Sequence, residues 1–141
     1  MILASEDIGN ADPQALCVAV AVAQAVERVG MPESQIILSQ AAAYMACAPK
    51  SNSAVNAISA AMDSVKRKKT TVPPHLQDAH YGGHEKLGRG IGYKYAHNFP
   101  NHYVEQQYLP SEILGEKFYE LSDMGYEKTL KEHMRRIKGK P

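Results

Sequence analysis

Proline and glycine residues divide the alanine-rich first half of this chain into helical segments. Asp12 followed by Pro13 is typical of a helix start, and Gly30 directly follows a helical run, which predicts a helix over residues 13–29. A second helix is predicted from Met31-Pro32 to Cys47, where Pro49 prevents its continuation. Sixteen of the first 63 residues are alanine, so these helices can approach closely in a compact bundle.

Two further helices follow from apolar spacing. One begins at Ser51 or Asn52, ends in the run Lys66 to Lys69, and carries apolar side chains on one face: Val55, Ile58, Met62 and Val65. The other covers about residues 124–137 and is expected to turn four side chains inward: Tyr126, Leu130, Met134 and Ile137.

Residues 70–110 differ from both flanks. They are rich in Pro, Gly, His and Asn, lack a sustained helical period, and hold five of the eight tyrosines: Tyr81, Tyr93, Tyr95, Tyr103 and Tyr108. Such a density of aromatic residues predicts a long ordered loop region that packs onto something, with a short turn at 84–87. With a short extended segment over 116–121, the chain is predicted to be a single, mostly α domain (residues 1–141) with little or no strand.

The charge is polarised along the chain although the net charge is only +1. Residues 1–63 carry a net −4, and residues 66–102 carry a net +5 together with five of the six histidines. The overall balance excludes a histone-like protein, whereas the middle third alone is basic.

Cys17 and Cys47 lie in apolar stretches without paired spacing, which predicts reduced, buried thiols in a cytosolic protein. The longest apolar run, Ala15 to Ala23, has nine residues, about half of what a membrane span requires. The acidic start of the chain is also unlike a signal peptide. We therefore expect no membrane association.

Two motifs resemble nucleotide loops only superficially. Pro49-Lys50-Ser51-Asn52 has a Lys-Ser pair at a helix start but lacks the glycines and the strand of a phosphate loop, although one anionic group at that helix start remains compatible with it. Gly88 to Gly92 has cofactor-loop spacing without a preceding strand and is better interpreted as a tight turn.

The histidines of the middle third do not predict a metal centre. These histidines are His75, His80, His84, His97 and His102. Their spacing lacks the short ligand pairs that zinc prefers, and both cysteines are distant from them in the sequence. A nucleophilic pair of Cys47 with one of them is disfavoured because no activating charge lies beside Cys47. No catalytic residue and no metal ligand is predicted.

The strongest chemical pattern is basic and aromatic. Lysine and arginine neutralise phosphates, and aromatic rings stack on unpaired bases. The candidate DNA-binding residues are Lys66, Arg67, Lys68, Lys69, Arg89 and Lys94. The alternative interpretation is a solvated helix end beside packed core tyrosines.

Six strings occur in an order that resembles the C-terminal part of the RarA/MgsA family of replication-associated recombination proteins, which are AAA+ ATPases related to clamp loaders and to the Werner-helicase-interacting protein. They are Ala4–Gly9, Ala11–Leu16, Ala48–Asn52, Val72–Leu76, Gly92–His97 and Gln106–Pro110. The family-motif residues in or beside loops are Asp7, Asp12, Lys50, Ser51, Asn52, His75, Tyr93, Tyr95, His97 and Tyr108.

The resemblance implies a clamp-loader-collar-like helical domain that holds subunits together, as a homotetramer, without enzymatic activity of its own. It implies that ATP and Mg²⁺ belong to an upstream AAA+ module whose Walker motifs are absent here. For the parent protein it implies DNA and single-strand-binding protein as partners, a role in fork maintenance, repair and recombination, and a cytoplasmic, nucleoid-associated location. Two hypotheses follow: an oligomerisation domain, or a contact module for single-stranded DNA or single-strand-binding protein.

Overall fold

The computed structural model describes residues 1–80 and 82–139, and this part of the chain is helical without any strand. Two short helices, η1 (Ala4–Ile8) and η2 (Gly9–Ala11), lead into α1 (Gln14–Val29), α2 (Ser34–Cys47), α3 (Ser53–Arg67) and α4 (Gly125–Ile137). The predicted mostly helical fold is confirmed, and each predicted helix begins and ends within a few residues of its observed bounds. Tyr81, one of the predicted loop tyrosines, lies outside the described residues.

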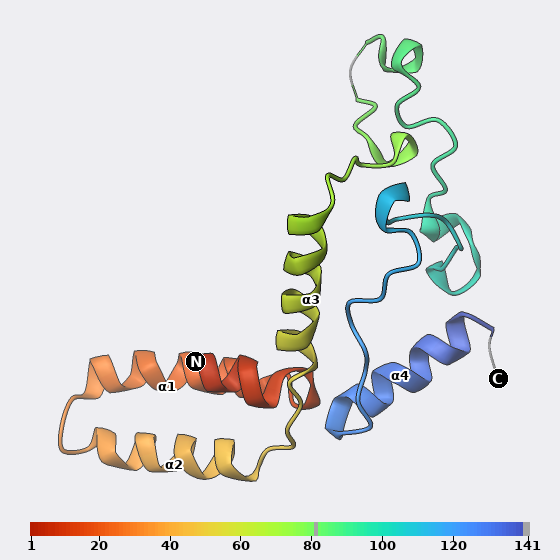
Figure 1. Cartoon of the computed structure of the whole chain (residues 1–141). Coiled ribbons are helices and arrows are strands. Elements are labelled where there is room, and N and C mark those ends of the chain that lie inside the picture. Colours follow the sequence, from red (N-terminus) through yellow and green to blue (C-terminus); the bar gives the residue numbers. More distant parts are fainter. Residues whose placement is uncertain (81, 140–141) are drawn as a thin grey trace.

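Helices α1 and α2 form an antiparallel hairpin (Figure 1). Gly30 ends α1 with a positive φ of 77° and donates its N–H to the Val26 carbonyl, and the Ser34 hydroxyl donates to the Gly30 carbonyl at 2.6 Å. At the other end, the Tyr44 hydroxyl donates to the Asp12 carboxylate at 2.5 Å. The hairpin is thus fixed at its turn and at its base.

Helix α3 leads from the base of the hairpin to residues 70–110, which we call the tyrosine-rich region (Figure 1). The chain then returns to α4, which begins beside the same base. Between α3 and α4 the described chain forms only short 3-10 turns: η3 (Pro74–Leu76), η4 (His84–Leu87), η5 (Ala96–Asn98), η6 (Pro100–His102) and η7 (Ser111–Ile113). The predicted turn at 84–87 is confirmed, and residues 116–121 run without regular structure or strand pairing.

The buried apolar core is small. The fully buried hydrophobic residues among those described are Ala4, Ile8, Ala11, Ala15 and Ile113. Most of them lie where η1, η2 and the start of α1 meet, with Tyr44 and Met45 of α2 packed against this cluster. The core therefore sits at the base of the hairpin.

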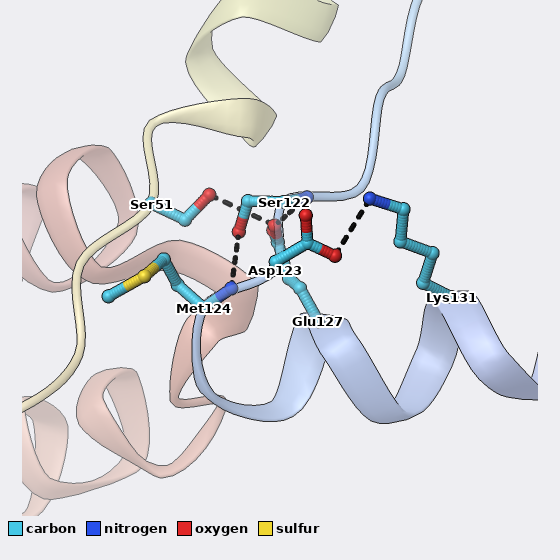
Figure 2. A network of polar contacts seen from close by, with 6 residues as sticks. All are labelled: Ser51, Ser122, Asp123, Met124, Glu127 and Lys131. Atoms are coloured by element: carbon cyan, nitrogen blue, oxygen red, sulfur yellow. Dashed lines mark hydrogen bonds and ion pairs between the residues drawn. The ribbon is translucent and has the colours of Figure 1, made fainter.

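A buried carboxylate joins α4 to this base. Glu127, with no exposed surface, accepts hydrogen bonds from the hydroxyls of Ser51 (3.0 Å), Ser53 and Tyr119 (3.0 Å) and from the Ser122 N–H (2.8 Å). Figure 2 shows Glu127 facing Ser51 and Ser122, with the Asp123–Lys131 ion pair beside it. Burial raises the pKa of Glu127, but the hydrogen bonds from Ser122, Ser53 and Tyr119 outweigh it and lower the pKa to about 2.

Two glycines allow the backbones to meet at this junction. Gly9 and Gly125 have positive φ values of 52° and 50°. A Cβ on Gly9 would lie 2.9 Å from the Ser51 carbonyl oxygen, and one on Gly125 would overlap the Ala11 carbonyl oxygen. Only glycine satisfies both the conformation and the spacing at these positions.

The inward face predicted for α4 is wrong at Tyr126, which is about half exposed, because the first turn of α4 directs Glu127 into the junction instead. The cysteines are free, but the prediction that they are buried is wrong: Cys17 and Cys47 are both exposed. In the described part of the chain, both thiols are therefore open to solvent.

We predict that Glu127→Gln destabilises the fold by about 2–3 kcal/mol near neutral pH, because the new NH₂ group faces groups that are themselves donors. Since the folded pKa lies below the ordinary value, the contribution of the carboxylate is present above about pH 4.5 and is lost as the pH falls toward 2, about 3 kcal/mol in all. Urea unfolding followed by circular dichroism across this range should show a steeper loss for the unmodified chain than for the variant. Glu132→Gln, on the exposed side of α4, is the control, and parallel pH profiles for Glu127→Gln and the unmodified chain would contradict this prediction.

A second prediction concerns Gly125. Gly125→Ala should reduce the free energy of unfolding by at least about 2 kcal/mol more than Gly115→Ala, since both glycines have positive φ but a Cβ on Gly115 meets nothing within 4 Å. Both variants carry the cost of a side chain at positive φ, so the difference between their thermal unfolding measures the steric cost of the Cβ at residue 125. Equal losses would show that α4 does not approach Ala11 as described.

Candidate functional site

A cavity opens at the base of the hairpin, beside the core. Its volume is about 760 Å³, and it is lined by Leu3, Asp7, Ala42, Met45, Ala46, Lys50, Ser51 and Asn52. Four of the family-motif residues proposed from the sequence therefore come together around one cavity, although Asp7 lies more than forty residues before the other three. The Ser51 N–H donates to the Asp7 carbonyl at 2.8 Å, which holds the two strings together.

Lys50 is used inside the fold. Its ammonium group donates to the carbonyl oxygens of Met45 (2.8 Å) and Ala46 (3.3 Å) at the end of α2 and to that of Ala48. A positive charge at a helix C-terminus is stabilising because it compensates the unpaired carbonyls there. Lys50 is therefore a cap of α2 in this structure.

The anionic group considered for the start of α3 is supplied by the chain itself. The carboxylate of Glu127 accepts from Ser51 and Ser53, the residues at the beginning of that helix. A carboxylate at a helix N-terminus is favourable, and this one leaves no need for an external anion. Sequence reasoning missed Glu127, since its only signal was an acidic residue in the first turn of a helix.

Asp12 connects the two helices of the hairpin. Its carboxylate accepts the N–H of Gln14 at 3.1 Å, as expected for a residue at a helix start, and also the Tyr44 hydroxyl. The hydrogen bond to Asp12, with burial, raises the pKa of Tyr44. Asp12 thus has a structural role.

The loop residues named from the sequence order the tyrosine-rich region. His75 Nε2 donates to the Gln107 carbonyl at 2.7 Å. The Gln106 amide bonds to both the N–H and the carbonyl of Lys94 and donates to the Tyr108 hydroxyl at 3.0 Å. Residues 70–80 and 90–108 are therefore held by specific contacts between the outgoing and returning chain.

An exposed group of rings lies in the same region. The ring centroids of Tyr95 and His97 are 5.0 Å apart, and those of His97 and His102 are 4.9 Å apart. Asn101 and His102 have positive φ values of 56° and 50°, an uncommon conformation for residues other than glycine. Tyr93 and Tyr108 are also about half exposed, so several aromatic side chains of this region are accessible from solvent.

The candidate DNA-binding residues have unequal surroundings. Lys66 and Lys69 are exposed near the end of α3, and the Arg67 Nε donates to the Asp63 carbonyl. Lys68 is bound to the Glu116 carboxylate at 2.8 Å and to the Glu112 carbonyl, and the Lys94 ammonium contacts the Glu105 carbonyl at 3.3 Å. Arg89 is half-buried and also makes an interaction. Lys68 and Lys94 thus help to fix the returning chain.

Large apolar side chains are exposed on the hairpin, on α3 and in the tyrosine-rich region. On the hairpin they are Leu16, Val20, Val29, Met31, Ile36 and Leu38. In the tyrosine-rich region they are Val72, Leu87, Ile91, Tyr93, Tyr95, Phe99 and Tyr108. On α3 they are Ile58, Met62 and Val65, whose spacings of four and three residues place them on one face of that helix.

The described residues show neither a group of metal ligands nor a membrane-spanning helix. No three histidine, cysteine, aspartate or glutamate side chains gather there as metal ligands would; the His84 side chain lies outside the description. The described helices also include none that is both long and apolar enough to cross a membrane.

The comparisons with known proteins agree with the resemblance. A family model described as the MgsA AAA+ ATPase C terminal matches residues 1–138. Replication-associated recombination protein A of Bacillus subtilis is 46% identical over 94% of this chain, and its Escherichia coli K12 counterpart 39% over 95%. An uncharacterized AAA domain-containing protein of Mycobacterium tuberculosis is 47% identical over 98%.

In each case the chain spans about a third of the relative's length: 32% for the Bacillus subtilis protein, 30% for the Escherichia coli protein and 31% for the Mycobacterium tuberculosis protein. The family match nevertheless covers nearly the whole chain, including the strings around the cavity and in the tyrosine-rich region. This chain therefore belongs to the family of MgsA AAA+ ATPase C-terminal domains.

Proposed function

We propose that this chain is an oligomerisation domain that holds copies of an AAA+ ATPase together. The observation that carries the proposal is α2: apolar side chains occur all round this helix, yet only Ser34 is buried. A helix that is apolar on every side is normally enclosed by other helices. Within one chain α1 covers one side of α2, so a second copy is the natural cover for the rest.

The exposed area supports the same proposal. The chain exposes 10277 Å², whereas size scaling gives about 7,200 Å² for a typical folded monomer of 15.5 kDa. The excess of roughly 3,000 Å² exceeds the ~800 Å² that each partner contributes to a stable protein interface. Association of copies would remove this excess from water.

For the longer protein we propose the role that its relatives' names describe, replication-associated recombination. ATP and Mg²⁺ would bind an upstream AAA+ module, and DNA and single-strand-binding protein would be partners of the whole assembly in the cytoplasm. The chain described here would contribute no catalytic residue and would set the spacing of the ATPase modules in a tetramer.

Sedimentation equilibrium of residues 1–141 at micromolar concentration tests the oligomerisation proposal. We expect a discrete oligomer, a tetramer by family resemblance, in which Cys17 and Cys47 react with a thiol reagent more slowly than in the unfolded chain. A monomer at all accessible concentrations would contradict it.

The exposed rings of Tyr95, His97 and His102 favour a second candidate function, contact with single-stranded DNA. Aromatic faces stack on unpaired bases, and Lys66, Arg67 and Lys69 at the end of α3 would neutralise phosphates. Lys68 is left out of this set because it anchors the returning chain through Glu116.

The salt dependence of oligonucleotide binding tests this second function. Replacing Lys66, Arg67 and Lys69 with Ala should flatten the plot of log affinity against log salt concentration by about 2 units, since each phosphate contact on a single strand contributes about 0.7. The matched control removes the same charge from α4 and the residue that follows it through Lys128→Ala, Arg135→Ala and Lys138→Ala. Equal slopes for the two triple variants would exclude the α3 site.

A further inference from the structure

We propose that the apolar face of α3 packs antiparallel against the same face of α3 in a second copy of the chain. This α3 face consists of Val55, Ile58, Met62 and Val65. The inference rests on the proposed oligomerisation function and adds to it the contacting surface and the relative orientation of the two chains.

Helix α3 is inverted relative to an ordinary surface helix, since it buries polar residues and exposes apolar ones. Its buried residues are Ser53 and Ser64. By contrast, Ile58, Met62 and Val65 are 59%, 47% and 50% exposed. A surface helix of a globular protein normally turns its apolar side chains toward the core. The exposed side of α3 is therefore built for a contact that the single chain does not make.

The four side chains of the α3 face form one continuous row. Each residue of an α-helix turns about 100° from the one before it. The spacings of three, four and three residues therefore place all four side chains within an arc of about 80°. A continuous apolar row marks a contact surface, whereas apolar residues exposed singly are common on monomers.

The opposite side of α3 packs on its own chain. The walls of a cavity of about 580 Å³ include Ser53, Asn56 and Ala60 of α3 and residues 117–121 of the returning chain. By the same helix geometry, this side lies about 180° from the α3 face. The hairpin and α4 meet α3 only near its start (Figure 1). The described part of the chain therefore leaves most of the α3 face open, and its cover comes from another molecule.

A second copy suits this face because the face is complementary to itself. Its spacing is that of two helices that pair along a common apolar seam. Ala54, Ser59 and Ala61 flank the row, and side chains this small let two helix axes approach closely. The excess exposed area of roughly 3,000 Å² exceeds the ~800 Å² that each partner contributes to a stable interface. It leaves the exposed hairpin residues for further contacts in a larger assembly.

Charge selects the antiparallel orientation. Residues 66–69, at the end of α3, are all lysine or arginine. A parallel pair would place two such runs side by side, where like charges repel. In an antiparallel pair the runs lie at opposite ends of a helix of fifteen residues, about 22 Å long. This separation exceeds the screening length of about 8 Å at physiological salt.

An antiparallel pair also fixes which side chains meet. The α3 face extends from residue 55 to residue 65, so full overlap of two copies puts residue 60 at the symmetry axis. Ile58 of one copy then lies opposite Met62 of the other. In the same way, Val55 lies opposite Val65.

Two charge variants test the pairing: an acidic variant with Ile58→Glu and Met62→Glu, and a basic variant with Ile58→Lys and Met62→Lys. Both side chains are exposed in the single chain, so each variant should keep its circular dichroism and unfolding transition. Each variant alone should have its dissociation constant for self-association raised at least roughly 100-fold, because apolar contacts are lost and like charges face one another. An equimolar mixture should form mixed dimers in native mass spectrometry, since glutamate then faces lysine.

The control carries Leu114→Glu and Tyr126→Glu, at two exposed apolar positions outside α3. It makes the same change of charge as the acidic variant and should associate like the unmodified chain.

Disulfide cross-linking tests the orientation in a chain whose exposed cysteines are replaced through Cys17→Ser and Cys47→Ser. A mixture of Val55→Cys chains and Val65→Cys chains should cross-link, because a disulfide requires Cα atoms within about 7 Å and these positions lie opposite each other. Val65→Cys chains alone should not cross-link, since their new thiols lie about 15 Å apart along the helices.

The outcomes separate this inference from the proposed function. If the unmodified chain associates and both charge variants associate as tightly, the inference is wrong while the oligomerisation function stands. If both variants are monomeric and their mixture stays monomeric, α3 meets a different surface and the pairing is wrong. Cross-linking of Val65→Cys chains alone would overturn the antiparallel orientation. A monomeric unmodified chain would remove the oligomerisation function and this contact with it.

Discussion

The buried carboxylate of Glu127 is the interaction on which the arrangement of the helices depends. The apolar core holds little more than alanines and Ile8, so it can fix the hairpin base but offers α4 few apolar contacts. Four donors from two segments, residues 51–53 and 119–122, converge on Glu127 instead. A buried charge satisfied in this way tolerates little displacement of any partner. Gly9 and Gly125 make the convergence possible because the backbones meet where a Cβ would not fit.

This junction leaves the rest of the molecule extended from one point. The hairpin leaves it in one direction and α3 carries the tyrosine-rich region in another, so both present apolar surface to water. Such a layout suits a domain whose stability is completed by association, because apolar area that one chain cannot enclose is enclosed by its neighbours. The polar contacts of the tyrosine-rich region, such as His75 to Gln107, keep that surface ordered before any partner arrives.

The helices were predictable because their signals are local. Asp12, Gly30 and Pro49 act within a turn of the position they mark, through a cap, a positive φ and a missing N–H, so the helix limits could be predicted without knowledge of the tertiary fold. The faces of those helices were less predictable. Apolar spacing identifies a stripe but not its cover, and for this reason the exposed Tyr126 and the exposed cysteines differ from the prediction.

The sequence by itself determined the helical segments, the order of the family strings and the separation of acidic from basic residues, since all three are properties of neighbours along the chain. Only the tertiary structure decided that Lys50 caps α2, that Lys68 ties down the returning chain, and that Glu127 supplies the anion at the start of α3. The physical reason is distance along the chain: Glu127 lies 76 residues from Ser51, and no local rule states which donors a carboxylate will meet once the chain has folded.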